Sequence, residues 1–169
     1  SVSYTTRSMR VGEENGKDYF FISDNEFRQK ITQGFFIEYA EVHNYLYGTP
    51  KEPIYQNILA GRDVLLQIDV QGAARVRNFI MTSDESICPI RKGQYVDIFI
   101  MPPDIDTLRR RLEGRCSDDE QAIKRRLINA EREMKRWHEY RYVVINDEID
   151  IAYDKIRAII IAEHCKTRY

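Results

Sequence analysis

Two arginines near the N-terminus lie in a predicted loop that follows a short strand. Arg7 and Arg10 lie in the stretch T-T-R-S-M-R (5–10), and Tyr19 follows nine residues later. A guanidinium presents a planar fork of donors that matches phosphate oxygens, and it does not lose its charge. The pair therefore suits a phosphate, although these residues alone favour two ordinary surface arginines in a loop.

A carboxylate in a strand-like segment is a candidate for base recognition. In F-F-I-E-Y-A-E-V (35–42), strand alternation puts Glu38 on one face and Ile37 and Tyr39 on the other. A carboxylate can accept two parallel hydrogen bonds from the N1–H and N2–H edge of guanine, a pair of donors that adenine lacks. The hydroxyl of Thr49, in the expected turn Y-G-T-P (47–50), could serve the O6/N7 side. Taken alone, Glu38 is more simply a solvated strand residue.

An aspartate stands near the end of an apolar segment. Residues 63–70 predict a strand buried on both faces, and Asp69 stands at its carboxyl end. Ligands bind at that end of the strands in open α/β sheets. Asp69 could equally cap the helix expected after Gly72, and the sequence gives the two interpretations equal weight.

Two amphipathic helices carry arginines at the borders of their apolar faces. Helical spacing puts Arg111 beside the apolar face of a helix from residue 104, and Arg126 beside that of a helix from about 118. Arg115 lies on the connection between them. Phosphoryl transfer needs such cations because charge spreads over the transferred group. Solvated helix faces with i,i+4 ion pairs are the commoner cause of this pattern.

The remaining pattern alternates strands and helices. From residue 61 onward this alternation favours a parallel sheet with helices on both faces, whereas residues 7–60 contain more short strands and turns, as an insertion would. A polar loop of unusual length is expected over 81–94. The expected strands cover 1–6, 19–22, 35–43, 63–70, 95–101 and 142–146, and the expected helices cover 23–33, 52–60, 72–79, 104–114, 117–138 and 150–164.

Composition narrows the class of protein. The chain has 169 residues and a formal net charge of -1, with a sequence pI of about 6.3, which argues against a long nucleic acid as partner. The three cysteines form no C-x-x-C pair and predict free thiols in a reducing cytosol. The histidines lack metal-ligand spacing. No leader and no apolar run of membrane-spanning length is present, so a cytoplasmic protein with no membrane contact is expected.

Taken together and in this order, these stretches resemble the guanylate kinase family over nearly the whole chain. The matching motifs are S-V-S-Y-T-T-R (1–7), G-K-D-Y-F-F (16–21), F-I-E-Y-A-E-V (36–42), L-Y-G-T-P (46–50), I-D-V-Q-G-A (68–73), I-M-P-P (100–103), R-R-L-E-G-R (110–115) and V-I-N-D-E (144–148).

The resemblance implies a single α/β domain over 1–169. This domain would have a parallel-sheet P-loop kinase core with helices on both faces, an inserted α+β subdomain at 7–60 that binds GMP, and a helical lid at about 109–135. The implied activity is transfer of the γ-phosphate of ATP to GMP, with Mg²⁺ carried by ATP, no metal held by the protein, and a monomer or homodimer as the assembly.

The resemblance also implies residue roles. The GMP phosphate would be bound by Arg7, Arg10, Tyr19 and Tyr47, with Ser3 close by. The guanine would be read by Glu38, Thr49 and Asp69. The lid that closes over ATP would supply Arg111, Arg115 and Arg126.

The sequence departs from the family pattern in its phosphate loop. The motif G-x-x-x-x-G-K-[ST] does not occur, and its place would be before Ser1, so we expect it upstream. The nearest stretch, at 12–18, has one residue too few between its glycines and carries two carboxylates that would repel phosphate. Gln67 stands where a second acidic residue is usual, and Cys116 where the lid usually has glycine. These departures leave an alternative: a catalytically inactive module of the same fold that binds GMP or a protein partner.

Overall fold

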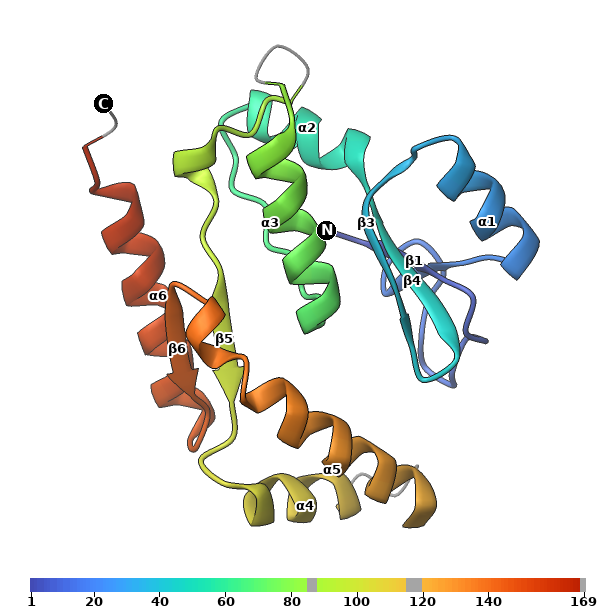
Figure 1. The fold of residues 1–169 in the computed structure, drawn as a ribbon, viewed down its shortest axis with the longest axis vertical. Helices are drawn as coiled ribbons and strands as arrows, with labels where there is room; N and C mark the ends of the chain where they lie inside the picture. Colours follow the sequence, from blue (N-terminus) through green and yellow to red (C-terminus); the bar gives the residue numbers. More distant parts are fainter. Residues whose placement is uncertain (85–87, 115–119, 168–169) are drawn as a thin grey trace. The chain divides into compact units, whose positions relative to one another are not determined.

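The computed structural model describes residues 1–84, 88–114 and 120–167, and it divides into two compact units, Ser1–Tyr95 and Val96–Tyr169. The first unit contains β1 (Ser3–Thr5), β2 (Tyr19–Phe21), α1 (Asp24–Thr32), β3 (Phe36–Val42), β4 (Tyr45–Pro50), α2 (Lys51–Leu59), α3 (Val70–Thr82) and the 3₁₀ turn η1 (Lys92–Gln94) (Figure 1). The second contains β5 (Ile98–Met101), α4 (Ile105–Glu113), α5 (Glu120–Met134), the 3₁₀ turn η2 (Trp137–Glu139), β6 (Tyr142–Ile145) and α6 (Ile149–His164).

A four-stranded mixed sheet forms the centre of the first unit. Its strand order is β2-β1-β4-β3, with β1 parallel to β2 and every other pair antiparallel. β3 and β4 make a hairpin whose two turn residues, His43 and Asn44, have φ of 52° and 67°. A two-residue hairpin turn needs such positive φ values. The turn expected at 47–50 was therefore wrong, because those residues lie in strand β4.

The two faces of this sheet are covered by different helices. On one face, Phe27 of α1 packs with Phe36 and Leu46. On the other, Ile37 packs with Val76 of α3 in a second apolar cluster. Figure 1 shows α1 and α3 on opposite sides of the hairpin.

A β-bulge at the start of β3 changes which side chains share a face. Phe36 pairs with Pro50 and Glu38 pairs with Thr49, so Ile37 is an extra residue on β3. Because of this extra residue, Ile37 and Glu38 both lie on the α3 side. The expectation that they lie on opposite faces was wrong, since simple alternation does not hold through a bulge.

Residues 62–69 do not form the predicted strand. A strand needs a hydrogen-bonded neighbour, and within the described residues no strand pairs with this segment. Only one side of the segment is covered: Val64, Leu66 and Ile68 pack on the apolar cluster beside α3, whereas Leu65 is 74% exposed. The apolar composition is thus that of a half-buried segment.

The expected loop over 81–94 contains part of the core. α3 continues to Thr82, and Cys88 and Ile90 are buried in the same cluster as Val76. Residues 85–87 lie outside the described part of the chain. Cys88 is a free thiol, as is the exposed Cys165, and Cys116 lies outside the described residues.

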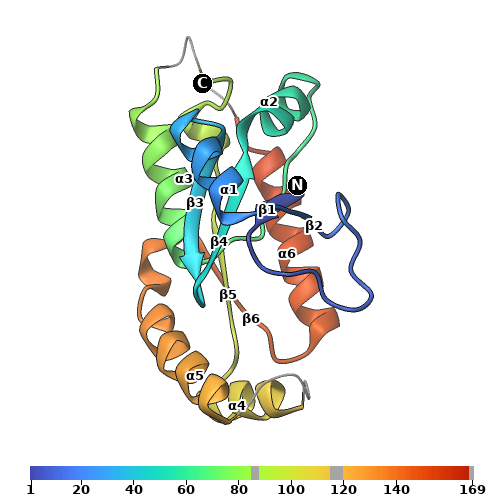
Figure 2. The same ribbon diagram turned by 90° about the vertical axis from the view of Figure 1, so that its right-hand side faces the viewer.

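The second unit is built on a parallel pair of strands, β5 and β6. α6 packs against β6, and α4 packs against α5 (Figure 2). β5 begins at Ile98, so the strand expected at 95–101 is shorter than predicted, and it is only partly buried because Ile100 is 51% exposed. Val144 of β6 is 1% exposed. α5 ends at Met134, which leaves Trp137 outside the helix predicted to contain it.

The fold class is mixed α/β, in agreement with the coarse expectation. Among the described residues, the helices include none with the length and apolar character that crossing a membrane requires. Local signals for helix ends were confirmed where the residues are described. Ser23 accepts a hydrogen bond from the N–H of Glu26, and Asp104 accepts one from the N–H of Thr107.

Candidate functional site

Arg7 follows β1 and is held by a carboxylate of the same loop. Its Nη2 donates to Oε1 of Glu13 at 2.7 Å, and its Nη1 donates to Oε2 at 3.0 Å and to the carbonyl of Ser8 at 2.7 Å. The rings of Tyr19 and Phe21 each lie 5.6 Å from the guanidinium carbon, within cation–π range. With a side chain only 10% exposed, Arg7 is not the solvated surface arginine that its local sequence favoured.

Glu13 organises this loop. Its Oε2 also accepts from the backbone N–H of Arg10 at 2.7 Å, and its own N–H donates to the carbonyl of Arg10. The hydrogen bond from Arg7 is the main cause that lowers the pKa of Glu13 to about 2, and the N–H of Arg10 adds to it. Sequence reasoning missed Glu13, because it treated the carboxylate only as a repulsive charge. The available signal was an acidic residue six positions after an arginine in a glycine-flanked loop.

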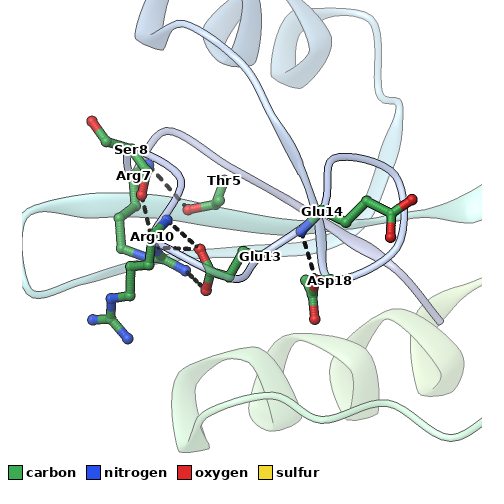
Figure 3. A network of polar contacts seen from close by, with 7 residues as sticks. All are labelled: Thr5, Arg7, Ser8, Arg10, Glu13, Glu14 and Asp18. Atoms are coloured by element: carbon green, nitrogen blue, oxygen red, sulfur yellow. Dashed lines mark hydrogen bonds and ion pairs between the residues drawn. The ribbon is translucent and has the colours of Figure 1, made fainter.

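The side chain of Arg10 is exposed and points away from Glu13, as Figure 3 shows. A second hydrogen bond stabilises the later part of the loop: the N–H of Glu14 donates to Oδ2 of Asp18 at 2.8 Å. The loop thus fixes the backbone of Arg10 while leaving its guanidinium available to an approaching anion. Arg10 and Arg7 therefore belong to one hydrogen-bonded loop.

Two tyrosines lie beside this loop. The rings of Tyr19 and Tyr47 meet edge to face at 5.9 Å, and a hydrogen bond with Tyr47 is one of the causes that raise the pKa of Arg7. Tyr19 comes from β2 and Tyr47 from β4. The side chains of Arg7, Tyr19 and Tyr47 therefore lie together, whereas Arg10 is in the same loop as Arg7 with its side chain exposed.

A chain of polar side chains crosses the same sheet to Glu38. Oγ1 of Thr49 donates to Oε1 of Glu38 at 2.5 Å, and Oγ of Ser3 lies 3.2 Å from Oγ1 of Thr49. Since Thr49 gives its only hydroxyl proton to the carboxylate, Ser3 is the donor in the second contact. Thr49 is fully buried and Glu38 is 5% exposed, so Glu38 is not a solvated strand residue.

Burial sets the electrostatics of Glu38. Desolvation is the main cause that raises the pKa of Glu38, and the nearby charge of Asp69 raises it further. The hydrogen bond from Thr49 and the positive charge of Arg75 act in the opposite direction. The guanidinium of Arg75, on α3, lies 4.6 Å from the ring centroid of Tyr39. A carboxylate in this state is desolvated and can bind complementary donors strongly.

Asp69 caps the helix that approaches Glu38. Its Oδ1 accepts from the N–H of Gly72 at 2.8 Å at the start of α3, and Gln71 donates to its Oδ2 at 3.2 Å. The capping interpretation of Asp69 is therefore confirmed. A ligand-binding role is compatible with it and stays a prediction.

The sheet register explains why these residues meet. Thr49 is paired with Glu38, Tyr47 is paired with Thr5, and Ser3 is paired with Tyr19. Residues two apart on a strand share a face, so these side chains lie on one side of the sheet. The predicted residues on this face or in the loop after β1, all within the first unit, are Ser3, Arg7, Arg10, Tyr19, Glu38, Tyr47 and Thr49. Asp69 lies at the start of α3, close enough to Glu38 to affect its pKa.

The predicted lid arginines belong to the second unit. Arg111 donates from Nη1 to the carbonyl of Asn146 at 2.6 Å and from Nη2 to that of Asp147 at 2.7 Å. It thereby joins α4 to the segment after β6. Arg126 is half-buried on α5, and Arg115 lies outside the described residues. The described residues contain no group of three or more His, Cys, Asp or Glu side chains suited to a metal ion.

Comparisons with known proteins agree with the motifs. A family model described as guanylate kinase matches residues 1–163. The chain is 43% identical over 166 residues to a guanylate kinase of Caldanaerobacter subterraneus subsp. tengcongensis, covering 98% of this chain and 75% of the relative. It is 45% identical over 162 residues to a guanylate kinase of Oleidesulfovibrio alaskensis, covering 96% and 73%.

A solved structure supports the same conclusion. The crystal structure of guanylate kinase from Anaplasma phagocytophilum matches with a TM-score of 0.80 and 37% identity, covering 99% of this chain and 76% of that one. The matched relatives are thus longer than the chain, which spans about three quarters of each. A family match over residues 1–163 and identities above 40% across nearly the whole sequence leave one conclusion: the chain belongs to the guanylate kinase family.

Proposed function

We propose that this protein transfers the γ-phosphate of ATP to GMP, giving ADP and GDP. The observation that carries the proposal is the buried carboxylate of Glu38 inside a chain whose relatives are named guanylate kinases. No observation favours the alternative of an inactive module. A cytoplasmic location and a monomeric or homodimeric state remain predictions.

Guanine recognition would rest on Glu38. Its carboxylate would accept from N1–H and N2–H of the base, while the hydroxyl of Thr49 fixes the carboxylate through Oε1. Asp69 lies close enough to Glu38 to raise its pKa and would contact the same edge of the base. AMP would leave this buried acceptor without its donors, which is the strongest form of discrimination available to a binding site.

Phosphate recognition would rest on the loop after β1. Arg7 and Arg10 would neutralise the phosphate charge, and Tyr19 and Tyr47 would donate from their hydroxyls, with Ser3 between the two ends of the site. The hydrogen bonds from Arg7 to Glu13 support this role because they hold the guanidinium in one orientation before the ligand arrives. The phosphate would meet the N–H groups of Arg7 that Glu13 and Ser8 do not use. The subdomain that binds GMP would comprise 7–60.

The lid would comprise about 109–135 and supply Arg111, Arg115 and Arg126 to the phosphoryl group. For Arg111 this requires release of the carbonyls of Asn146 and Asp147. Mg²⁺ would arrive with ATP as part of the substrate. Lid closure would exclude water from the transfer.

The test compares GMP with AMP. Purified protein and its Glu38→Gln variant are assayed for nucleoside diphosphate formation from ATP, with the affinity for each monophosphate measured by calorimetry. We expect the wild type to favour GMP, and the variant to lose this preference by roughly 10⁴-fold, because an amide cannot accept both guanine donors. Glu41→Gln, an exposed residue on the same strand, is the matched control.

Two outcomes would count against the proposal in different ways. An unchanged GMP/AMP ratio in Glu38→Gln would remove Glu38 from base recognition. Absence of GMP binding at millimolar concentration in the wild type would favour the inactive alternative.

A further inference from the structure

Gly72 stands at the point where α3 comes closest to Glu38. A Cβ atom at position 72 would lie 2.8 Å from Oε2 of Glu38, 3.2 Å from Cβ of Ile68 and 3.3 Å from Oδ1 of Asp69. Cβ atoms essentially never lie within 3.0 Å of such a heavy atom, so the first contact is too short to keep. The backbone φ of Gly72 is not in the left-handed region, so the helix itself does not require glycine here.

Glu38 has little freedom to avoid such a contact. Its side chain is 5% exposed, Oε1 is held by Thr49, and the β-bulge fixes its backbone on the α3 side. The N–H of Gly72 is itself taken by Asp69. Gly72 thus touches both acidic residues proposed to read the base, one through its backbone and one through the space left by its missing side chain.

We propose that Gly72 is a positioning residue that determines base specificity, because its lack of a Cβ allows the carboxylate of Glu38 to lie against the start of α3. The inference rests on the proposed function of Glu38 as the guanine acceptor. Any side chain at position 72 displaces Oε2 and moves the acceptor away from the N1–H and N2–H edge. Helix formation favours alanine over glycine, so the helix does not explain the glycine, and the shortest contact that a Cβ would make is the one with Glu38.

The experiment is a double-mutant cycle on GMP/AMP discrimination. The variants are Gly72→Ala, Glu38→Asp and the combination, with Gly93→Ala as the control because a Cβ there meets nothing within 4 Å. We expect Gly72→Ala to lower the GMP/AMP ratio of kcat/KM roughly 10²-fold, the loss typical of a displacement of about 1 Å. The change should fall on the KM for GMP rather than on kcat with saturating GMP.

The combined variant shows whether the two positions act through one contact. Aspartate is one methylene shorter and leaves room for the new Cβ, so adding Gly72→Ala to Glu38→Asp should cost about threefold or less. Effects that multiply in full would mean that the positions act independently, and would overturn the inference. Non-additivity is the signature of groups in direct contact.

The remaining outcomes separate this inference from the proposed function. If Glu38→Gln abolishes discrimination while Gly72→Ala leaves it intact, the base-reading role of Glu38 stands and the role of Gly72 is refuted. If Gly72→Ala fails to fold but folds in the Glu38→Asp background, the contact with Glu38 is confirmed directly. Failure to fold in both backgrounds would assign Gly72 to packing against Ile68 and overturn the inference.

Discussion

The two ends of the proposed GMP site hold their charges in different ways. At the phosphate end, Arg7 is neutralised by Glu13 in a loop where the carboxylate side chain is 19% exposed. At the base end, Glu38 is 5% exposed and its hydrogen-bond partner is the neutral hydroxyl of Thr49. The phosphate end thus contains an ion pair with a partly exposed carboxylate, whereas the base end contains a buried carboxylate whose hydrogen-bond partner carries no charge.

This difference assigns affinity and specificity to different ends of the proposed site. A cation at the phosphate end would contact a group that all nucleoside monophosphates share, so it would gain little from the identity of the base. A desolvated carboxylate is costly unless the right donors arrive, so it discriminates between bases. The phosphate end should therefore set how tightly a nucleotide binds, and the base end which nucleotide binds.

Replacing Arg7 should weaken binding of the phosphate without changing recognition of the base. We expect Arg7→Ala to weaken GMP binding by about 10- to 100-fold, since hydrogen bonds to charged groups contribute roughly 1.5–3 kcal/mol, while the GMP/AMP ratio stays the same. Calorimetric titration with GMP, AMP and guanosine measures this. Arg28→Ala, which removes an exposed arginine paired with Asp24 on α1, is the control. Equal losses for GMP and guanosine would contradict the assignment.

Lowering the pH should weaken recognition of the base before it weakens binding of the phosphate. The pKa of Glu38 is raised, so the carboxyl gains a proton as the pH falls through a value above the ordinary range, and a protonated carboxyl cannot accept both guanine donors. We expect GMP/AMP discrimination to drop about tenfold for each pH unit below that pKa. Binding measured across pH in wild type and Glu38→Gln tests this, because the variant should show no such dependence. A wild-type ratio that is flat with pH would exclude Glu38 as the titrating group.

The ion pair of Arg7 with Glu13 should make the thermal stability of the protein depend on pH in the acid range. This is the smallest of the predicted effects. The pKa of Glu13 is lowered to about 2, so its folded form binds a proton less tightly than its unfolded form. The stabilisation is therefore present above the ordinary glutamate pKa and is lost as the pH falls toward 2. Glu13→Gln should lower Tm by a few degrees at neutral pH, and the difference should vanish near pH 2.

Thermal unfolding across pH measures the effect of Glu13→Gln, with Glu14→Gln as the control. Glu14 pairs with Lys17 in a bridge where both side chains are more than two-thirds exposed, and such pairs contribute little. A Tm difference that is the same at every pH would mean that Glu13 acts through packing rather than charge.

Sequence signals were most accurate where the interaction is local. Ser23 and Asp104 were identified as helix caps from residues within one turn, and Gly34 ends α1 with a φ of 64°, as its position predicted. The family motifs also identified, residue by residue, a group of side chains that one face of the sheet gathers. These features depend on short stretches in which the residues that matter are close together in the sequence.

Sequence signals failed where pairing between distant residues decides the outcome. The bulge at Ile37 exists because of the register between β3 and β4, and the hairpin turn at His43 and Asn44 lacks the usual glycine. Leu65 was predicted to be buried because its neighbours are apolar, yet burial depends on which elements cover each side. Glu13 was missed because its partner, Arg7, was read separately.

The bulge at Ile37 also limits how this site can change. In a regular strand, substitutions alone alter a pocket and a deletion shifts every later side chain to the opposite face. Here the extra residue puts Glu38 on the same side as Ile37, so loss of residue 37 would restore alternation. Phe36 would stay on the α1 side and Glu38 would stay paired with Thr49, while the cluster beside α3 would lose the side chain of Ile37. A one-residue deletion at the bulge would therefore affect the packing against α3 rather than the strand register that places Glu38.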